Sequence, residues 1–252
     1  MKRINSHGMF FAAIVAAIMV TAACSIKEGK TMGGATASEE RSQPGDSMVY
    51  GLACDGCSDT ILVLLPLTGE DPDTFDILEA SKAQQVFGRP MVGDKLAVML
   101  NAEDKKVADL VVDIDKLKGE WCYLVTPQLR QRADFDPSTL SPEEKERMDT
   151  MLKKMMQPRE YGIEIRSENS VRPIGTRTVE REGPAMFPPQ KRYRQWHLFN
   201  GRLLLSETTR DTAGVVTVTL TDTAQFVMLR RDTMVLRFGD GEQGYYRRGV
   251  GS

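Results

Sequence analysis

Short apolar runs, separated by clusters of glycine, proline and aspartate, make up the chain between residues 48 and 115. The runs cover residues 50–53, 61–65, 75–78, 96–100 and 107–114. Runs of this length with turn residues between them are typical of the short strands of a sandwich or barrel. The run 61–65 is apolar at every position, which predicts a strand buried on both faces. This part of the chain is therefore expected to form a small β domain.

A second series of strand-like runs fills residues 116–250. After residue 160 the runs are 161–166, 171–176, 202–207, 215–220, 225–229, 233–238 and 244–248. Apolar and polar residues alternate in several of them, so that Val216, Val218 and Leu220 fall on one face. Asn200-Gly201, between two runs, predicts a type I′ hairpin. From Trp121 onward the pattern gives about nine strands, close to the eight of a small closed barrel.

One helix is expected, over residues 141–157. Ser141 supplies an N-cap, Pro142 suits the first helical position, and Glu144 completes a capping box. The apolar residues that then recur at helical spacing are Met148, Met151, Leu152, Met155 and Met156. Such a stripe usually packs into a core, and an adaptable methionine surface for a ligand or copper is the alternative. Because the helix is inserted between the first two strands of the barrel, we expect it to cover the barrel mouth.

The start of the chain follows a different pattern. Lys2 and Arg3 precede an apolar run at residues 9–20, and three small residues then lead into Cys24. This order is that of a secretory signal peptide, here residues 1–23, with a small-residue cleavage site. As a helix the run would span about 18 Å, which is too short for a hydrocarbon core of about 30 Å. The pattern therefore favours export over a membrane-spanning helix.

The cysteine directly after these small residues resembles the lipobox of bacterial lipoproteins. The resemblance implies diacylglycerol on the sulfur of Cys24, cleavage before it and acylation of the freed amine. Thr21 stands where a lipobox usually carries leucine, so cleavage without lipidation is the alternative. Two or three acyl chains would hold the protein stably at a membrane. The following residues, 24–47, contain almost no large apolar side chain and are expected to form a flexible tether.

Two further resemblances concern the folded part. The segment 92–98 (VGDKLAV) is similar to a strand of OB-like barrels, which implies a small OB-like β-barrel at residues 48–115. Gly119-Glu-Trp121 and the segment 193–203 are similar to small bacterial lipocalin-like domains. That similarity implies a lipocalin-like antiparallel β-barrel at residues 116–250. The expected fold is thus mainly β, with two barrels and one inserted amphipathic helix.

The lipocalin resemblance also implies a role for Trp121. In such barrels this tryptophan closes the base, and an arginine from a late strand stacks on its ring. Arg237, which lies within an apolar strand, is expected in that position, with Arg248 as the alternative. The contact would be structural rather than catalytic.

Cys54-Asp-Gly-Cys57 is the sharpest local motif of the folded part. An exported protein meets an oxidising compartment, so a disulfide between the two cysteines is expected. The alternatives are a copper or zinc site and a redox-active dithiol. The segment resembles that of copper-responsive envelope lipoproteins of the NlpE kind, which would imply metal. Cys122, next to Trp121 on a strand, should face the opposite side and remain an unreactive thiol.

Charge and motif content exclude several classes of function. The chain has 33 basic and 35 acidic residues and a net charge of −2, without a polybasic run, so nucleic acid is not an expected partner. After the signal peptide the one histidine is His197, which rules out a histidine-based metal cluster. No nucleophile elbow, P-loop or dinucleotide fingerprint is present. We therefore expect neither an enzyme nor a cofactor.

The combined expectation is a non-enzymatic protein that is lipid-anchored in the cell envelope, at the outer membrane. Ser25 after Cys24 is not acidic, which favours the outer over the inner membrane by the proteobacterial sorting rule. The barrel would bind a small apolar or amphipathic ligand, or an envelope protein. The alternatives are a metal or redox envelope-stress sensor that uses Cys54 and Cys57, and a structural subunit of an outer-membrane assembly.

Lipidation can be tested by intact mass. We expect the mature protein from membranes to begin at Cys24 and to carry the added mass of two or three acyl chains. The Cys24→Ala chain should lose that mass and leave the membrane fraction, because no other residue offers the acceptor sulfur at this position. An unmodified mass for the mature chain would contradict the lipoprotein assignment.

Overall fold

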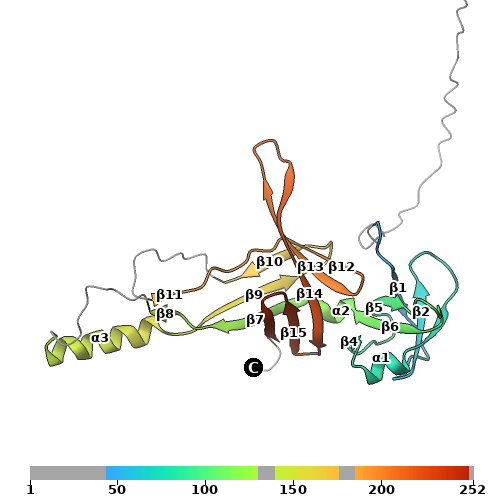
Figure 1. Cartoon of the computed structure of the whole chain (residues 1–252), viewed down its shortest axis with the longest axis horizontal. Coiled ribbons are helices and arrows are strands. Elements are labelled where there is room, and N and C mark those ends of the chain that lie inside the picture. The colour runs from blue at the N-terminus through green and yellow to red at the C-terminus, as the bar shows by residue number, and fades with distance from the viewer. Residues whose placement is uncertain (1–43, 130–139, 176–184, 250–252) are drawn as a thin grey trace, which may run out of the picture. The chain divides into compact units, whose positions relative to one another are not determined.

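The computed structural model describes residues 44–129, 140–175 and 185–249 and shows a mainly β protein (Figure 1). The expected signal peptide 1–23, the lipidation site Cys24 and most of the tether lie outside the described residues. No helix in the described ranges is long and apolar enough to cross a membrane.

The first sheet occupies the segment expected to be OB-like. Its strands are β1 (Met48–Ala53), β2 (Ile61–Pro66), β3 (Asp73–Asp76), β4 (Val86–Phe87), β5 (Lys95–Leu100) and β6 (Ala108–Asp113). Helix α1 (Leu78–Lys82) follows β3, and helix α2 (Ile114–Leu117) follows β6. The strand order is β3-β2-β1-β5-β6-β4, and only the β4–β6 pair is parallel among these ladders.

A further contact turns five of these strands into a small barrel. Asp76, at the end of β3, forms a parallel bridge with Val107 and donates its N–H to the carbonyl of Lys106 at 2.8 Å. This joins β3 to the start of β6 and closes the ring β1-β2-β3-β6-β5, the arrangement of an OB-like barrel. The interior is filled by one cluster of Ala53, Leu62, Leu64, Phe75, Ile77, Leu96, Val98, Ala108 and Val111.

The burial of β2 differs from the expectation. Leu62 and Leu64 are buried inside the small barrel, whereas Ile61 is 43% exposed and Val63 is half-buried. The prediction of a strand buried on both faces was wrong, because only one face of a barrel wall points inward.

Eight antiparallel strands form the second sheet. They are β7 (Gly119–Val125), β9 (Arg159–Ile165), β10 (Val171–Ile174), β12 (Gln195–Phe199), β13 (Arg202–Arg210), β14 (Val216–Leu229), β15 (Thr233–Phe238) and β16 (Gly241–Arg247). Apart from β10 and β12, each strand of this series pairs with the next one, and β16 returns to β7. Asn200 and Gly201 have φ values of 46° and 74°, as the predicted type I′ hairpin between β12 and β13 requires.

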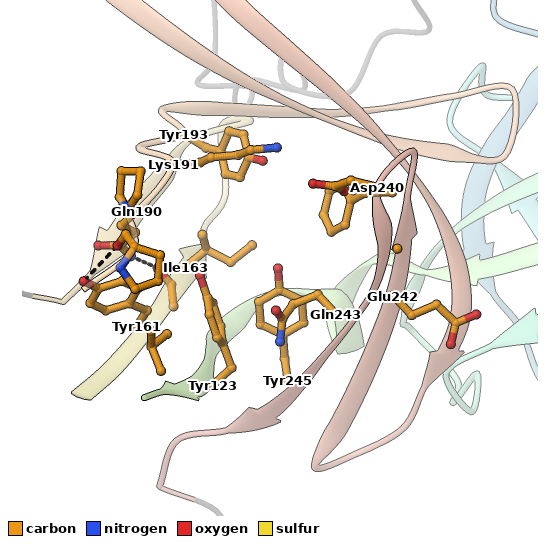
Figure 2. Close-up of a pocket in the computed structure, with 16 residues that line it drawn as sticks. Tyr123, Tyr161, Ile163, Gln190, Lys191, Tyr193, Asp240, Glu242, Gln243 and Tyr245 are labelled. Atoms are coloured by element: carbon orange, nitrogen blue, oxygen red, sulfur yellow. Dashed lines mark hydrogen bonds between the residues drawn. The ribbon is translucent and has the colours of Figure 1, made fainter. Parts of the chain in front are cut away.

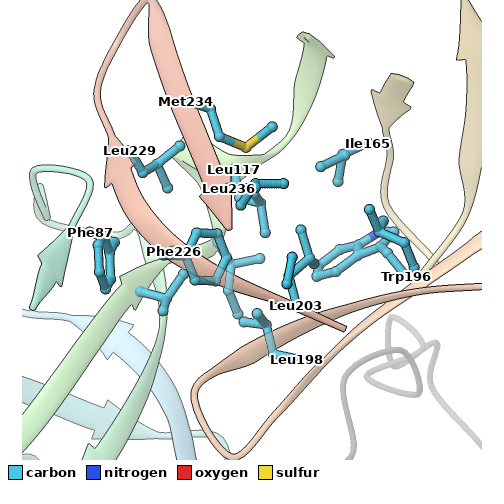
Figure 3. Close-up of a cluster of buried hydrophobic side chains, with 14 of the residues drawn as sticks. Phe87, Leu117, Ile165, Trp196, Leu198, Leu203, Phe226, Leu229, Met234 and Leu236 are labelled. Atoms are coloured by element: carbon cyan, nitrogen blue, oxygen red, sulfur yellow. The ribbon is translucent and has the colours of Figure 1, made fainter. Parts of the chain in front are cut away.

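The ring closes between β12 and the turn before β10. Ser170 and Gln195 form a bridge, the N–H of Val171 donates to Arg194 at 2.8 Å, and the N–H of Trp196 donates to Asn169 at 2.9 Å. The described strands therefore form a nearly closed up-and-down barrel, which confirms the expected antiparallel barrel. Part of the interior is solid core, where Trp196, Leu203 and Leu236 converge (Figure 3).

The barrel core continues onto the outer face of the small barrel. Phe87 and Phe226 stack at a centroid distance of 5.3 Å, and the N–H of Gly88 donates to Leu229 at 3.0 Å. At the β12–β13 turn, Asn200 accepts a hydrogen bond from the N–H of Ser47 at 2.9 Å. One buried cluster thus contains side chains of both sheets.

The expected helix is present as α3 (Pro142–Met155). Ser141 and Glu144 form both hydrogen bonds of the predicted capping box, and Pro142 opens the helix. No residue of α3 is buried, and Met151 is 55% exposed. The expectation that the methionine stripe is helix core is therefore wrong, and the helix does not bury this face over the barrel mouth. Between β7 and α3 lies the short strand β8 (Gln128–Leu129), which pairs with β11 (Ala185–Met186).

Asp113 is a fully buried acid at the end of β6. Its Oδ1 accepts the N–H of Lys116 at 3.0 Å and caps α2, whereas its Oδ2 has no hydrogen-bond partner. Burial, and secondarily the neighbouring Asp94 carboxylate, raise the pKa of Asp113 to about 7, against the opposing effects of Lys116. The protonated form is therefore the one that fits this site.

This acid should make stability depend on pH. The pKa of Asp113 is higher in the folded state than in the unfolded state, so between about pH 4 and 7 the folded protein binds more protons. The free energy of unfolding should fall as the pH rises through this window, by at most about 1.4 kcal/mol per pH unit.

Asp113→Asn should flatten this dependence in urea titrations across the window, because asparagine keeps the cap without the charge. Asp109→Asn, at an exposed position of the same strand, is the matched control and should retain the wild-type slope. An equal slope in wild type and Asp113→Asn would contradict the assignment.

Candidate functional site

A cavity of about 430 Å³ opens at one end of the eight-stranded barrel (Figure 2). The residues around it include four of the six tyrosines of the chain, Tyr123, Tyr161, Tyr193 and Tyr245. Phe238, Ile163, Val125, Gln190 and Lys191 add to the wall, and Asp240 and Glu242 lie at the rim. The volume is in the range of pockets that hold small molecules.

Strand alternation explains how the tyrosines converge. Trp121, Tyr123 and Val125 lie two residues apart on β7, so all three point into the barrel, with the tryptophan at the solid end. Tyr161 and Ile163 do the same on β9, and Tyr245 on β16. The tyrosines thus stand directly above the apolar layer that fills the other end of the barrel.

The rings support one another by edge-to-face contacts. The Tyr123 ring lies 5.3 Å from that of Tyr245 and 6.2 Å from that of Tyr161, both at nearly right angles. The hydroxyls of Tyr123 and Tyr245 have no hydrogen-bond partner in the part of the chain that the structure describes. Burial raises the pKa of both hydroxyls, so each remains a neutral donor. Figure 2 shows the two hydroxyl ends turned toward the inside of the cavity.

The opposite wall carries a fixed polar group. The hydroxyl of Tyr193 donates to Asp222 at 2.5 Å, and the ammonium of Lys191 lies 3.0 Å from the same carboxylate. Burial, and then the Asp222 hydrogen bond, raise the pKa of Tyr193. The Lys191 ammonium also lies 5.9 Å from the centre of the Phe238 ring. These contacts hold the side chains that precede β12 against the barrel.

Gln190 ties the segment before β12 to the strands across the opening. Its Nε2 donates to the carbonyl of Gly162 at 3.0 Å and to that of Ile174 at 2.6 Å. Its buried Oε1 has no hydrogen-bond partner among the described residues. At the rim, Glu242 forms an ion pair with Arg237 at 2.6 Å. Asp240 has no ion-pair partner within the described ranges, and its carboxylate is turned toward the opening in Figure 2.

The expected arginine contact at the base is made by a different residue. Trp121 is fully buried, and the guanidinium of Arg247 lies 4.3 Å from its ring centre. Arg247 also donates to the carbonyls of Lys118, at 2.8 Å, and Lys116. The prediction of Arg237 was wrong, because Arg237 follows the inward-facing Leu236 and therefore points outward to Glu242.

Cys54 and Cys57 lie in the turn between β1 and β2, and in the structure both are free thiols. The sulfur of Cys57 accepts the N–H of Val63 at 3.3 Å, and that of Cys54 lies 3.8 Å from the carbonyl of Leu52. The turn leads into strand β2, whereas the cysteines of a redox-active CxxC motif normally lie at the start of a helix. No group of three potential ligands for a metal is found among the described residues.

A second hollow, of about 650 Å³, lies beside Cys57 on the small barrel. Six of its thirteen lining residues are exposed, including Asp59, Lys82 and Arg89, and only Leu62 and Ile77 are buried. In contrast, Tyr161, Ile163, Tyr193 and Tyr245 of the barrel cavity are buried. The barrel cavity is therefore the better candidate for a binding site.

Cys122 and His197 are structural residues. Cys122 lies on the opposite face from Trp121, as predicted, and is fully buried beside Glu160 on the outside of the barrel. Burial raises the pKa of this thiol to about 11. His197 lies on β12, where its Nδ1 is 3.2 Å from the amide nitrogen of Asn169.

Comparison of the chain with protein-family models, with curated proteins and with solved structures finds no match. The cavity must therefore be interpreted from its own chemistry. The sequence reasoning named none of the four tyrosines as site residues. A signal was visible on β9, where Tyr161 and Ile163 alternate with Glu160 and Glu164.

Thiol accessibility tests the cysteine assignments. In the reduced Cys24→Ala chain, Ellman's reagent should react rapidly with Cys54 and Cys57, which are half-buried, and not with Cys122. The third thiol should appear only after unfolding, because it is buried and poorly ionised. Protein purified without reductant reports on the disulfide, since a Cys54–Cys57 bond would remove both rapid thiols. Rapid reaction of Cys122 in the folded protein would contradict its placement.

Proposed function

We propose that this protein binds a small amphipathic molecule in the tyrosine-lined cavity of its barrel. The observation that carries the proposal is the cavity itself, which is walled by buried aromatic rings and contains two tyrosine hydroxyls without hydrogen-bond partners among the described residues. Ligand sites are typically concave and apolar with a few fixed polar groups, and this cavity has that composition.

The wall chemistry suggests what the ligand looks like. An apolar or planar body would pack between the rings of Tyr123, Tyr161 and Tyr245. A polar end that accepts hydrogen bonds would meet the hydroxyls of Tyr123 and Tyr245. A donor on the same ligand would suit the buried Oε1 of Gln190 or the Asp240 carboxylate. A purely hydrocarbon ligand would leave these groups unsatisfied and is less well suited.

We further propose that binding takes place at the cell envelope, with the protein held at the outer membrane by acyl chains on Cys24. The signal-peptide pattern and the lipobox resemblance support this location. A tether of residues 24–47 would let the barrel reach ligands away from the lipid surface. Binding without covalent change is the role we propose, because Asp222 holds both the Tyr193 hydroxyl and the Lys191 ammonium in fixed contacts at the wall.

The competing proposal is a metal or redox sensor at Cys54 and Cys57. Its support is the CxxC motif, with both sulfurs free and partly accessible in one turn. Metal analysis of protein purified without chelator distinguishes the two functions. About one equivalent of copper or zinc, lost in Cys57→Ser, would favour the sensor.

Two neighbouring tyrosines allow a matched test of the cavity. Tyr245 points into the cavity, and Tyr246 points outward, where its hydroxyl donates to Glu160 at 2.5 Å. We expect 1-aminoanthracene, a small fluorescent amphipathic probe, to bind the wild-type protein. Tyr245→Leu should weaken that binding about tenfold, or ~1.4 kcal/mol, through the lost ring contact.

Tyr246→Leu should leave the probe affinity unchanged, and thermal melting should show that both variants are folded. Equal affinities for the two variants would place the probe elsewhere on the protein. Absence of any saturable binding, by this probe and by a panel of small amphipathic molecules, would contradict the proposed function.

A further inference from the structure

Strands β13 and β14 continue beyond the barrel as a two-stranded ribbon (Figure 1). β12 pairs with β13 only as far as Ser206, and β15 pairs with β14 only from Gln225. Among the described strands, residues 207–210 of β13 therefore pair with β14 alone, and residues 216–224 of β14 pair with β13 alone. Every residue from 211 to 220 is exposed. The ribbon therefore has two open edges.

The loop at its tip fixes which backbone groups are free. The N–H of Asp211 donates to the carbonyl of Val215 at 3.0 Å, and Gly214 has a φ of 85°. Hydrogen-bonded pairs alternate along an antiparallel ladder, so the next such pair is Thr209 with Thr217. The N–H and carbonyl groups of Val216 and Val218 consequently point away from β13, toward the open edge.

The open edge of β14 lacks the sequence features that normally prevent an edge strand from pairing with another chain. Residues 215–221 (VVTVTLT) contain no charge and no proline, and six of the seven are β-branched valine or threonine. The one bulge falls at Thr219, between the paired residues Val218 and Leu220. Val216 is 46% exposed and Val218 is 53% exposed. Natural edge strands are usually interrupted by lysine, proline or a cover, and an isolated two-stranded ribbon is only marginally stable in water. A partner strand would resolve both problems.

We propose that the partner is a second copy of this chain, joined through the open edge of β14. An antiparallel pair centred on Thr217 places Val216 of one copy opposite the partner's Val218, and the reverse. Both residues then use the backbone groups that are free in the single chain. Thr217 faces the partner's Thr217, a favourable cross-strand pair. The result is a four-stranded sheet across a two-fold axis.

Charge supports self-pairing in this register. The residues that pair, 216–218, carry no charge, and Asp211 lies in the tip loop outside β14, so no like charges meet where the two copies pair. A second copy presents the same uncharged edge, so the two edges can pair without repulsion between like charges. Residues 215–221 carry no lysine or arginine, which disfavours an anionic lipid surface as the occupant. The paired area is smaller than a standard interface, so the association should be weak and concentration-dependent.

A photo-crosslinking amino acid at Thr217 tests the proposal in cells that make the full chain. We expect a product of two copies, identified by mass spectrometry, and none when the crosslinker is at Asp109, an exposed residue of the small barrel. Val218→Lys should reduce the product at least about fivefold, because a lysine then stands on the paired edge. Thr212→Lys, in the tip loop and outside the paired strand, is the matched control and should retain the product.

A rescue experiment tests the register. When expressed singly, Val216→Glu and Val218→Lys should each abolish the product, because a charge then stands on the paired edge. Co-expression of the two should restore it, since glutamate and lysine face each other across the axis. Thermal melting controls for folding. Because both positions are exposed, the two substitutions should leave the melting temperature of the wild-type protein unchanged. Products with only another protein or with lipid, or no product from Thr217, would overturn the proposal.

Discussion

The closure of the eight-stranded barrel beside Trp196 is the contact on which the rest of the structure depends. The backbone of Trp196 pairs with Leu205 on one side and bonds to Asn169 on the other. Its indole N–H donates to the carbonyl of Arg166 at 2.8 Å. A sheet with these strands left open would expose the apolar side chains that Figure 3 shows in its interior. Because the ring is closed, one end can be filled with core and the other can remain hollow.

The division of the barrel into a solid end and a hollow end follows from side-chain choice along each strand. On β7 the inward positions run from Trp121 to Tyr123 to Val125, from the largest apolar ring to residues that leave space. Arg247 donates to the backbone carbonyls of Lys118 and Lys116 and lies over the Trp121 ring, so these contacts hold its charged side chain at the base of the barrel. The tyrosines above combine an apolar body with a hydroxyl, which suits the boundary between core and solvent.

Short-range sequence signals predicted the turns, the helix and the strands well. The contacts that form the site depend instead on residues far apart in the sequence. The Asn200-Gly201 turn, the Ser141 capping box and the strand alternation depend on neighbours within a few residues, and each was readable. The contact between Trp121 and Arg247 depends on strand parity over more than a hundred residues, where a shift of one position exchanges inside for outside. The convergence of the four tyrosines depends on the same registers. The exposed face of α3 shows a further limit, since periodicity predicts an apolar stripe but not what covers it.

The N-terminal end of β1 has a mechanical consequence. Ser47 and Asp46 bond to Asn200, at 2.9 Å and 3.0 Å, where the β12–β13 turn meets the small barrel. Any tension that reaches the folded part through the preceding residues is applied first to this joint. The whole length of β12 separates the joint from Tyr193 and the cavity. A force applied at Ser47 would therefore act on the seam between the two barrels before it reaches the walls of the cavity.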